Sequence, residues 1–235
     1  MKLRLMICAM AASTALFAAD YTGDGKIYGV LGVTDTATSN TVVGVPWVSA
    51  TGGQISLSNL VSTATLESGD IVYLYEDNTT WYGYRLNGSV WEPMTTVGTN
   101  SVTSAGPADG KALVRGKGLI IQRAHNADPI YLCGRDEAVT GATTPIPANA
   151  TMLIANPALV TKNITTGVVG DQIRVILNGG AMDIYEKRSD GWYGTVTDMT
   201  FGFPMTSKVK LDDGVPLAAG KGAWYVSKGE SSIAW

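Results

Sequence analysis

The sequence is poor in the residues that most often carry catalysis, metal binding and disulfides. The chain of 235 residues contains 1 His and 2 Cys, and only 16% of its residues are charged. One His and one Cys, which remain if the N-terminal segment that contains Cys8 is removed, are too few for a zinc site. So little charge excludes a coiled coil, and the 45% of hydrophobic residues excludes a disordered chain. The formal net charge of -3 gives no reason to expect nucleic acid as a partner. We therefore predict no metal, no cofactor and no nucleic-acid partner.

Residues 1–18 have the pattern of a secretory signal peptide. Lys2 and Arg4 provide the positive N-terminal region, residues 5–16 form a short apolar stretch, and Ala18 precedes the expected cleavage site. No later run reaches the 18 or so apolar residues of a membrane helix. We expect an exported protein that is extracellular, periplasmic or on the cell surface, with no transmembrane helix in the mature chain.

Cleavage would remove Cys8 and leave Cys133 as the one remaining thiol. A mature exported chain with a single Cys forms no internal disulfide, so its stability has to come from packing. Cys133 lies in Pro-Ile-Tyr-Leu-Cys-Gly, a sequence typical of a strand. We expect a buried, unreactive thiol there rather than an intermolecular disulfide.

Several sequence blocks occur twice in the same order, which predicts an internal duplication. The spacing from the Trp of a Trp-Tyr-Gly segment to the following Pro-Met pair is twelve positions in both halves. We interpret residues 19–140 and 141–235 as two related β repeats. The recurring blocks are Gly-Asp at 69–70 and 170–171, Trp-Tyr-Gly at 81–83 and 192–194, and Asp-Gly-x-x-Leu-x-x-Gly-Lys-Gly at 109–118 and 213–222.

Short runs of β-branched and aromatic residues, separated by Gly, Asn-Gly, Asp-Gly and Pro, predict an all-β protein with almost no helix after the signal peptide. The clearest expected strands are 71–75, 119–121, 173–177 and 223–226. The run at 71–75 is apolar throughout rather than alternating, which indicates a strand covered on both faces. A pseudo-symmetric, duplicated β-sandwich or barrel-like body with one shared core is slightly favoured over two abutting small domains.

The chain resembles a group of uncharacterised, exported, β-rich bacterial proteins. The likeness rests on Val-Pro-Trp at 45–47, on the Gly-Asp pairs that open strands, and on the Gly-x-Gly turns that lead into apolar or aromatic strands. It covers most of the mature chain. Because these motifs shape turns and strands, the resemblance implies a secreted β protein but no activity and no site residues.

No residue set has the pattern of a catalytic site. His125 and Asp128 lie in an expected hairpin turn between strands 119–122 and 130–133, and no nucleophile motif accompanies them. Asp212-Asp213-Gly214 lacks the spaced oxygen ligands of a calcium loop. We therefore expect these residues to shape turns.

Two further candidates occur once in each repeat. Glu76 and Glu186 occupy matching positions, but a catalytic carboxyl pair needs two different environments, so we interpret them as solvent-facing strand ends. The two Gly-Lys-Gly elements lack the Ser or Thr and the helix of a phosphate-binding loop, and we interpret them as glycine turns with the Lys in water. We expect no enzyme, and a glycan hydrolase is the least favoured alternative.

Aromatic residues are the best candidates for ligand contacts. Neighbouring strand residues point to opposite faces, so Trp81-Tyr82 and Trp192-Tyr193 should each place one ring outward. The pattern places Trp81 outside in the first repeat but Tyr193 outside in the second. A binding site shared by both repeats would predict agreement, so packing in the core or at its rim is the competing interpretation. These four residues are the ligand-binding candidates.

These features favour an exported, non-enzymatic surface or extracellular β protein that acts in assembly or adhesion. Its partner would be another copy of the chain or a surface glycan. A carbohydrate-binding module is the first alternative. A small outer-membrane β-barrel is the second, because Tyr225, Ile233 and Trp235 alternate along the last strand, although Ser227 and Gly229 interrupt this apolar side.

Overall fold

A computed structural model describes residues 20–21, 27–33, 40–49, 54–75, 80–94, 96–97, 100–101, 107–108, 111–124, 129–135, 141–176, 182–198 and 205–235. The expected signal peptide, residues 1–18, lies outside these ranges, and so does Cys8. Within the described ranges, no helix combines the length and the apolar character that crossing a membrane requires.

The described residues form an all-β structure, as predicted, and they include one short helix, α1 (Leu57–Leu60). Runs rich in β-branched and aromatic residues account for the strands, because such side chains fit a pleated, half-buried surface. The four clearest predicted strands are confirmed as β5 (Ile71–Tyr75), β11 (Leu119–Gln122), β16 (Gln172–Ile176) and β21 (Gly222–Val226).

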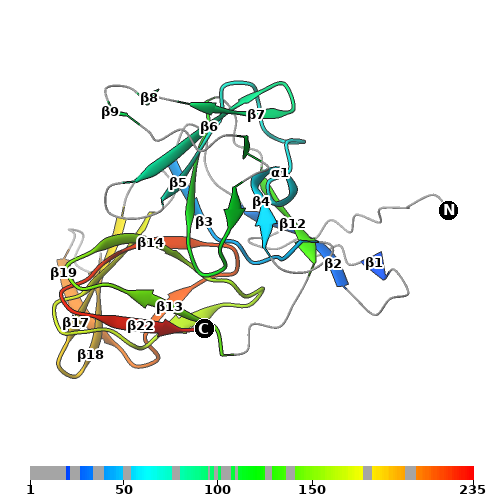
Figure 1. Ribbon diagram of the computed structural model, residues 1–235. Coiled ribbons are helices and arrows are strands. Elements are labelled where there is room, and N and C mark those ends of the chain that lie inside the picture. Colours follow the sequence, from blue (N-terminus) through cyan, green and yellow to red (C-terminus); the bar gives the residue numbers. More distant parts are fainter. Residues whose placement is uncertain are drawn as a thin grey trace.

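Two open antiparallel sheets carry the two halves of the chain (Figure 1). In both, an early strand lies at one edge, a late strand pairs beside it, and consecutive strands continue the sheet outward. The first sheet has the order β3 (Asn40–Val43), β11, β5, β6 (Trp81–Asn87) and β7 (Val90–Met94). The second has the order β14 (Thr151–Ala155), β21, β16, β17 (Met182–Arg188), β18 (Gly191–Asp198) and β19 (Met205–Leu211).

Smaller sheets surround these two. One has three strands in the order β1 (Asp20–Tyr21), β2 (Ile27–Val33) and β12 (Ile130–Arg135). The others are strand pairs: β4 (Ile55–Ser56) with β10 (Ala112–Leu113), β8 (Thr96–Val97) with β9 (Asn100–Ser101), β13 (Thr143–Ile146) with β22 (Ser231–Ala234), and β15 (Lys162–Ile164) with β20 (Val215–Leu217).

Buried side chains form two clusters, and strand β5 contributes to both. Val72 and Leu74 belong to the first cluster, whereas Tyr75 belongs to the second and Tyr73 packs against it. The prediction that strand 71–75 is covered on both faces is therefore confirmed. The alternating residues at the end of the chain, Tyr225, Ile233 and Trp235, all lie in the second cluster.

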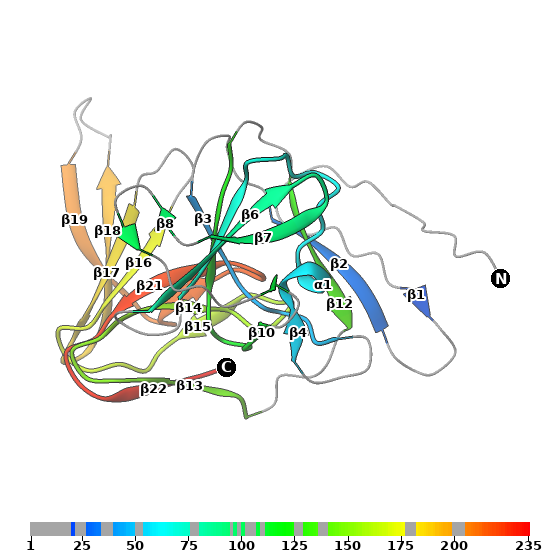
Figure 2. The same cartoon turned by 45° about the horizontal axis from the view of Figure 1, so that its top comes forward.

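The two Gly-Lys-Gly segments join the halves reciprocally. In the first, Gly116 O accepts a hydrogen bond from Ala155 N at 2.9 Å, and Lys117 bridges to Ile154 on β14. In the second, Gly220 O accepts one from Gly44 N at 2.9 Å, and Lys221 bridges to Val43 on β3. Each segment thus extends into the other half, and β3 lies beside β14 and β21 (Figure 2).

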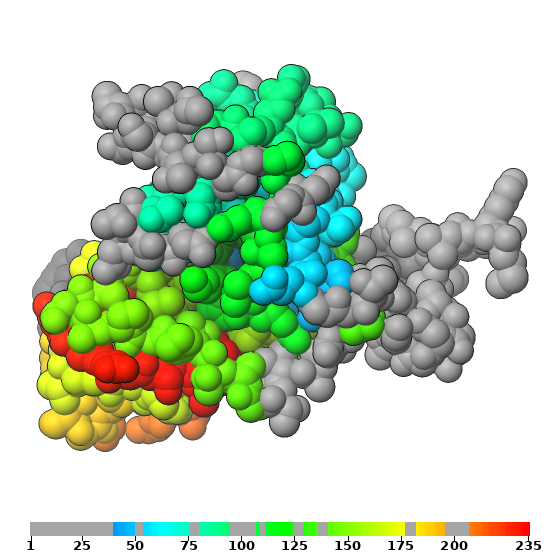
Figure 3. All heavy atoms as spheres, in the orientation of Figure 1, coloured from blue at the N-terminus to red at the C-terminus, as the bar shows by residue number. Residues whose placement is uncertain are grey.

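Gly222 is needed where the halves meet. A Cβ there would lie 2.6 Å from Val42 Cγ1 and 2.8 Å from Ile154 O, closer than real Cβ contacts. These segments therefore do more than turn the chain: their glycines let the two halves come into direct contact (Figure 3).

The expected correspondence of the two Trp-Tyr-Gly segments is wrong. Trp81 begins β6, which pairs directly with β5, whereas Trp192 lies in β18, which is separated from β16 by β17. The residue in the place of Trp192 is Trp91 on β7, and the two lie 22 positions after Gly170 and Gly69 respectively. The equal spacing to the Pro-Met pairs is thus not reflected in the strand pairing.

The expected hairpin between residues 119–122 and 130–133 is also wrong, although both segments are strands. Strand β11 pairs with β3 on one side and β5 on the other, so it has no free edge for β12. Strand β12 instead pairs with β2 in a separate sheet.

Candidate functional site

Aromatic rings from both sheets meet where the sheets approach each other. The ring centroids of Tyr75 and Trp81 are 4.8 Å apart, and each lies 5.8 Å from the ring of Trp224. Tyr75 is buried, whereas Trp81 and Trp224 stay partly exposed. Tyr73, also partly exposed, lies on the same face of β5 as Tyr75. We call Tyr73, Tyr75, Trp81 and Trp224 the aromatic seam.

Strand register explains why these rings meet. Tyr75 is paired directly with Trp81, so both side chains leave the first sheet on the same face. On β21 the buried Tyr225 points into the second cluster, so its neighbour Trp224 has to point to the opposite face. The seam therefore follows from strand parity together with contacts between residues about 150 positions apart.

Polar groups hold the seam in place. The Tyr73 hydroxyl donates to Gln122 Oε1 at 2.8 Å, and the Tyr75 hydroxyl donates to the carbonyl oxygen of Thr151 on the second sheet. Burial raises the pKa of Tyr73, and the nearby Arg85 opposes this shift. The Tyr73 phenol therefore stays protonated and is a hydrogen-bond donor at neutral pH.

The four predicted ligand-binding residues do not form one site. Trp81 belongs to the seam. Tyr82, on the opposite face of β6, packs against the first cluster with Lys111 Nζ 3.9 Å from its ring centroid. Trp192 is buried, as its strand parity predicted, and its Nε1 donates to Thr166 O at 3.1 Å.

Tyr193 occupies a polar, outer position on β18. Its hydroxyl donates to Asp190 Oδ2 at 2.8 Å, and the Arg188 guanidinium lies 4.4 Å from its ring centroid. It faces away from the core, as predicted, but contributes nothing to the seam.

The sequence patterns missed three of the four seam residues. Tyr73 and Tyr75 could have been found from the uninterrupted apolar run of β5, which signals a second covered face. Trp224 lies in the predicted strand 223–226, but no sequence motif marks it as a ligand-binding residue. Nothing local pairs it with Trp81, because that contact depends on how the two sheets pack.

The chain was also compared with protein-family models, curated proteins and solved structures. None of them matches.

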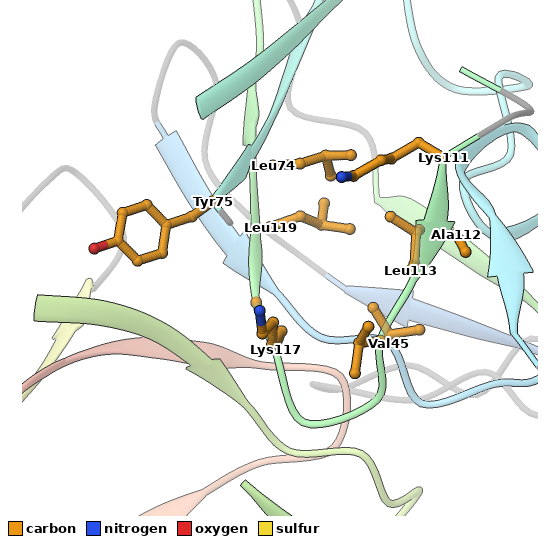
Figure 4. Close-up of a pocket in the computed structure, with 10 residues that line it drawn as sticks. Val45, Leu74, Tyr75, Lys111, Ala112, Leu113, Lys117 and Leu119 are labelled. Atoms are coloured by element: carbon orange, nitrogen blue, oxygen red, sulfur yellow. The ribbon is translucent and has the colours of Figure 1, made fainter. Parts of the chain in front are cut away.

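A small cavity lies beside β5 and β11, with a volume of about 50 Å³. Figure 4 shows Leu74, Leu113, Leu119 and the amine of Lys111 around it, whereas Tyr75 points away. Ligand sites usually measure roughly 300–1,000 Å³. This cavity has room for water but not for a ligand of ordinary size.

A larger and more open hollow of about 450 Å³ lies at β4 and α1. Hydroxyl and amide side chains dominate its lining, including Ser49, Gln54, Ser58 and Asn59. It contains no titratable side chain among its lining residues and no aromatic ring. It could hold a neutral polar molecule but offers no group for acid–base chemistry.

The described residues provide no catalytic set. Glu186 is bonded to Lys208, which lowers the pKa of this carboxyl and keeps it ionised on the outer face of β17. His125, Asp128 and Glu76 lie outside the described residues. Within the described part, His, Cys, Asp and Glu side chains form no group that could hold a metal ion.

Cys133 lies in β12, as the strand prediction required, and is partly buried. Burial raises the pKa of its thiol, which lowers the fraction of reactive thiolate.

Proposed function

We propose that the protein is an exported, non-enzymatic surface or extracellular β protein that acts in adhesion or assembly through the aromatic seam. One observation carries this proposal: Trp81 and Trp224, one from each sheet, lie side by side and stay partly exposed. Large aromatic side chains with an accessible face are typical anchors of binding surfaces.

We further propose that the chain is a duplicated, pseudo-symmetric sandwich-like body built from residues 19–140 and 141–235. The matching strand order of the two sheets supports this, as does the reciprocal exchange through Gly-Lys-Gly. A two-fold relation explains why each half contacts the other with equivalent segments.

The outer sheet edges favour adhesion through a face over assembly by strand addition. Strand β7 contains Pro93, which cannot donate a backbone hydrogen bond to a new strand. Strand β19 carries Lys208 and Lys210, and adjacent copies would bring like charges together. The inner edge strands β3 and β14 are bridged to the other half. Each edge of the two large sheets is thus protected or bridged.

The test is retention of the purified protein on insoluble polysaccharides and on cell-envelope material. We expect Trp81→Ala and Trp224→Ala to weaken retention roughly 30-fold, the effect of losing a binding hot spot of about 2 kcal/mol. Tyr193→Ala is the matched control, because its ring lies outside the seam. Trp224→Phe keeps an aromatic ring and should retain part of the binding.

Two results would contradict the proposal. One is no retention of the wild-type protein on any of these materials. The other is a loss that is as large for Tyr193→Ala as for the seam variants. Circular dichroism of each variant checks that a loss of retention does not come from unfolding.

A further inference from the structure

We propose that the partner of the aromatic seam is a polysaccharide that carries carboxylate groups, such as a uronic-acid polymer. This inference rests on the proposed function and names the class of ligand.

The seam combines apolar ring faces with polar donors. Trp81 and Trp224 offer flat surfaces that can stack on the C–H faces of sugar rings. The amide of Gln122 is fixed beside Tyr73, and the guanidinium of Arg174 is fixed by Gln172 Oε1 at 2.8 Å. Sugar units need both kinds of contact at once, because their ring faces are apolar and their hydroxyl edges are polar.

Two arginines flank the rings, one on each sheet. Arg174 is paired directly with Trp224 across β16 and β21, so both side chains lie on the same face. Arg85 lies on the same face of β6 as Trp81 and is close enough to Tyr73 to oppose part of the rise that burial causes in the pKa of this phenol. Each sheet thus places one arginine beside the rings.

These arginines have no carboxylate partner among the residues that the structure describes. The described ion pairs engage Arg123, Lys208 and Lys210 instead. Glu92 on β7 is paired directly with Arg85, and its carboxylate accepts a hydrogen bond from the Asn87 amide. A guanidinium binds a carboxylate with two parallel hydrogen bonds, so two arginines that take part in none of the described ion pairs favour an acidic ligand.

The spacing favours a polymer over a single sugar. Trp81 and Arg85 are four strand residues apart, which corresponds to roughly 13 Å. Trp224 and Arg174 are direct neighbours on the other sheet, with Cβ atoms about 5 Å apart. A ligand that reaches both arginines therefore has to pass over the rings and extend beyond one sugar unit.

The experiment compares acidic polymers with a neutral one of the same backbone. Polygalacturonate, alginate and hyaluronate are the acidic probes, and fully methyl-esterified polygalacturonate is the uncharged match. We expect affinity electrophoresis to show binding to at least one acidic polymer. If the protein binds polygalacturonate, its binding to the methyl-esterified polymer should be at least tenfold weaker.

Arginine variants test the site itself. Arg85→Gln and Arg174→Gln should each weaken binding to the acidic polymer about tenfold, the usual effect of losing a charge-assisted hydrogen bond. Arg188→Gln is the matched control, because this exposed arginine lies over Tyr193, outside the seam. It should change binding less than twofold.

The outcomes separate this inference from the proposed function. Equal binding to the esterified polymer, or no effect of both arginine variants, overturns the inference, while a loss with Trp81→Ala would still support the seam as a binding surface. Equally strong binding of polyglutamate identifies a site for acidic proteins and also overturns it. Retention on neutral polysaccharides without binding to any acidic polymer likewise overturns the inference. No retention on any material overturns both proposals.

Discussion

Both halves contain a buried Gly-Asp turn, but the side chain that contacts the Asp carboxylate is charged in the first half and neutral in the second. In each, the Gly of the Gly-Asp pair donates to the second strand after it, to Leu86 O on β6 in the first half and to Lys187 O on β17 in the second, both at 2.9 Å. In each, the Asp carboxylate accepts a backbone N–H three residues earlier, at 3.0 Å for Asp70 and 2.7 Å for Asp171. The backbone arrangement is the same in both.

The two carboxylates differ in their side-chain partner. Arg123 Nε lies 3.2 Å from Asp70 Oδ2, so a cation balances the first carboxylate. Asp171 instead accepts the hydroxyl of Tyr225 at 2.6 Å, and burial and this hydrogen bond raise the pKa of the phenol. The fold therefore requires an acceptor at this position, whereas the donor opposite it can be charged or neutral.

The largest expected effect comes from removing the two carboxylates. Asp70→Ala should lower the free energy of unfolding by about 3–5 kcal/mol, because it leaves the guanidinium of Arg123 buried without its counter-ion. Asp171→Ala should cost less, about 2–3 kcal/mol, since the groups left behind are neutral donors. Urea unfolding measures both. A larger cost for Asp171→Ala would show that the charge of Arg123 is not what separates the two turns.

An intermediate effect is expected where the halves meet. Gly222→Ala would place a Cβ 2.6 Å from Val42 Cγ1, whereas Gly118→Ala would place one 3.3 Å from the same atom. We expect thermal unfolding to show a loss of about 2–3 kcal/mol for Gly222→Ala and about 1 kcal/mol for Gly118→Ala, because overpacking grows with the overlap. Equal losses would indicate that the two sides of the junction adapt equally well.

The smallest expected effect concerns Trp91 and Trp192, which lie on corresponding strands of the two large sheets. Trp192 Nε1 donates to Thr166 O, whereas Trp91 Nε1 is buried and has no hydrogen-bond partner among the residues that the structure describes. Trp→Phe removes a similar volume at both sites, so the difference reports the hydrogen bond. We expect Trp192→Phe to cost about 1 kcal/mol more than Trp91→Phe in urea unfolding. A cost at least as large for Trp91→Phe would contradict this reading of the two sites.

Strand positions and the all-β class could be predicted from the sequence, because they depend on local periodicity and turn residues. Strands β5 and β21 show this, since both lie within a residue of their predicted bounds. The same holds for Trp192 and Tyr193, whose inward and outward directions follow from strand parity. The duplication, the export and the function stay predictions.

Strand pairing and the seam could not be predicted, because they depend on distant contacts. The Trp-Tyr-Gly motif suggested that Trp81 and Trp192 are equivalent, but hydrogen bonding places them in different positions of their sheets. Likewise Trp224 comes from the other sheet and lies beside Trp81 where the two halves pack together. A pattern read along one strand contains no information about such a contact.

The reciprocal junction also has a consequence for how the chain folds. Strand β3 is completed at one edge by Lys221, almost 180 residues later in the chain. The first half therefore keeps an unpaired edge until residues 220–222 are in place, and contacts of such long sequence separation form slowly. A chaperone that shields open β-edges during synthesis would thus protect the first half while its final hydrogen-bond partners are still missing.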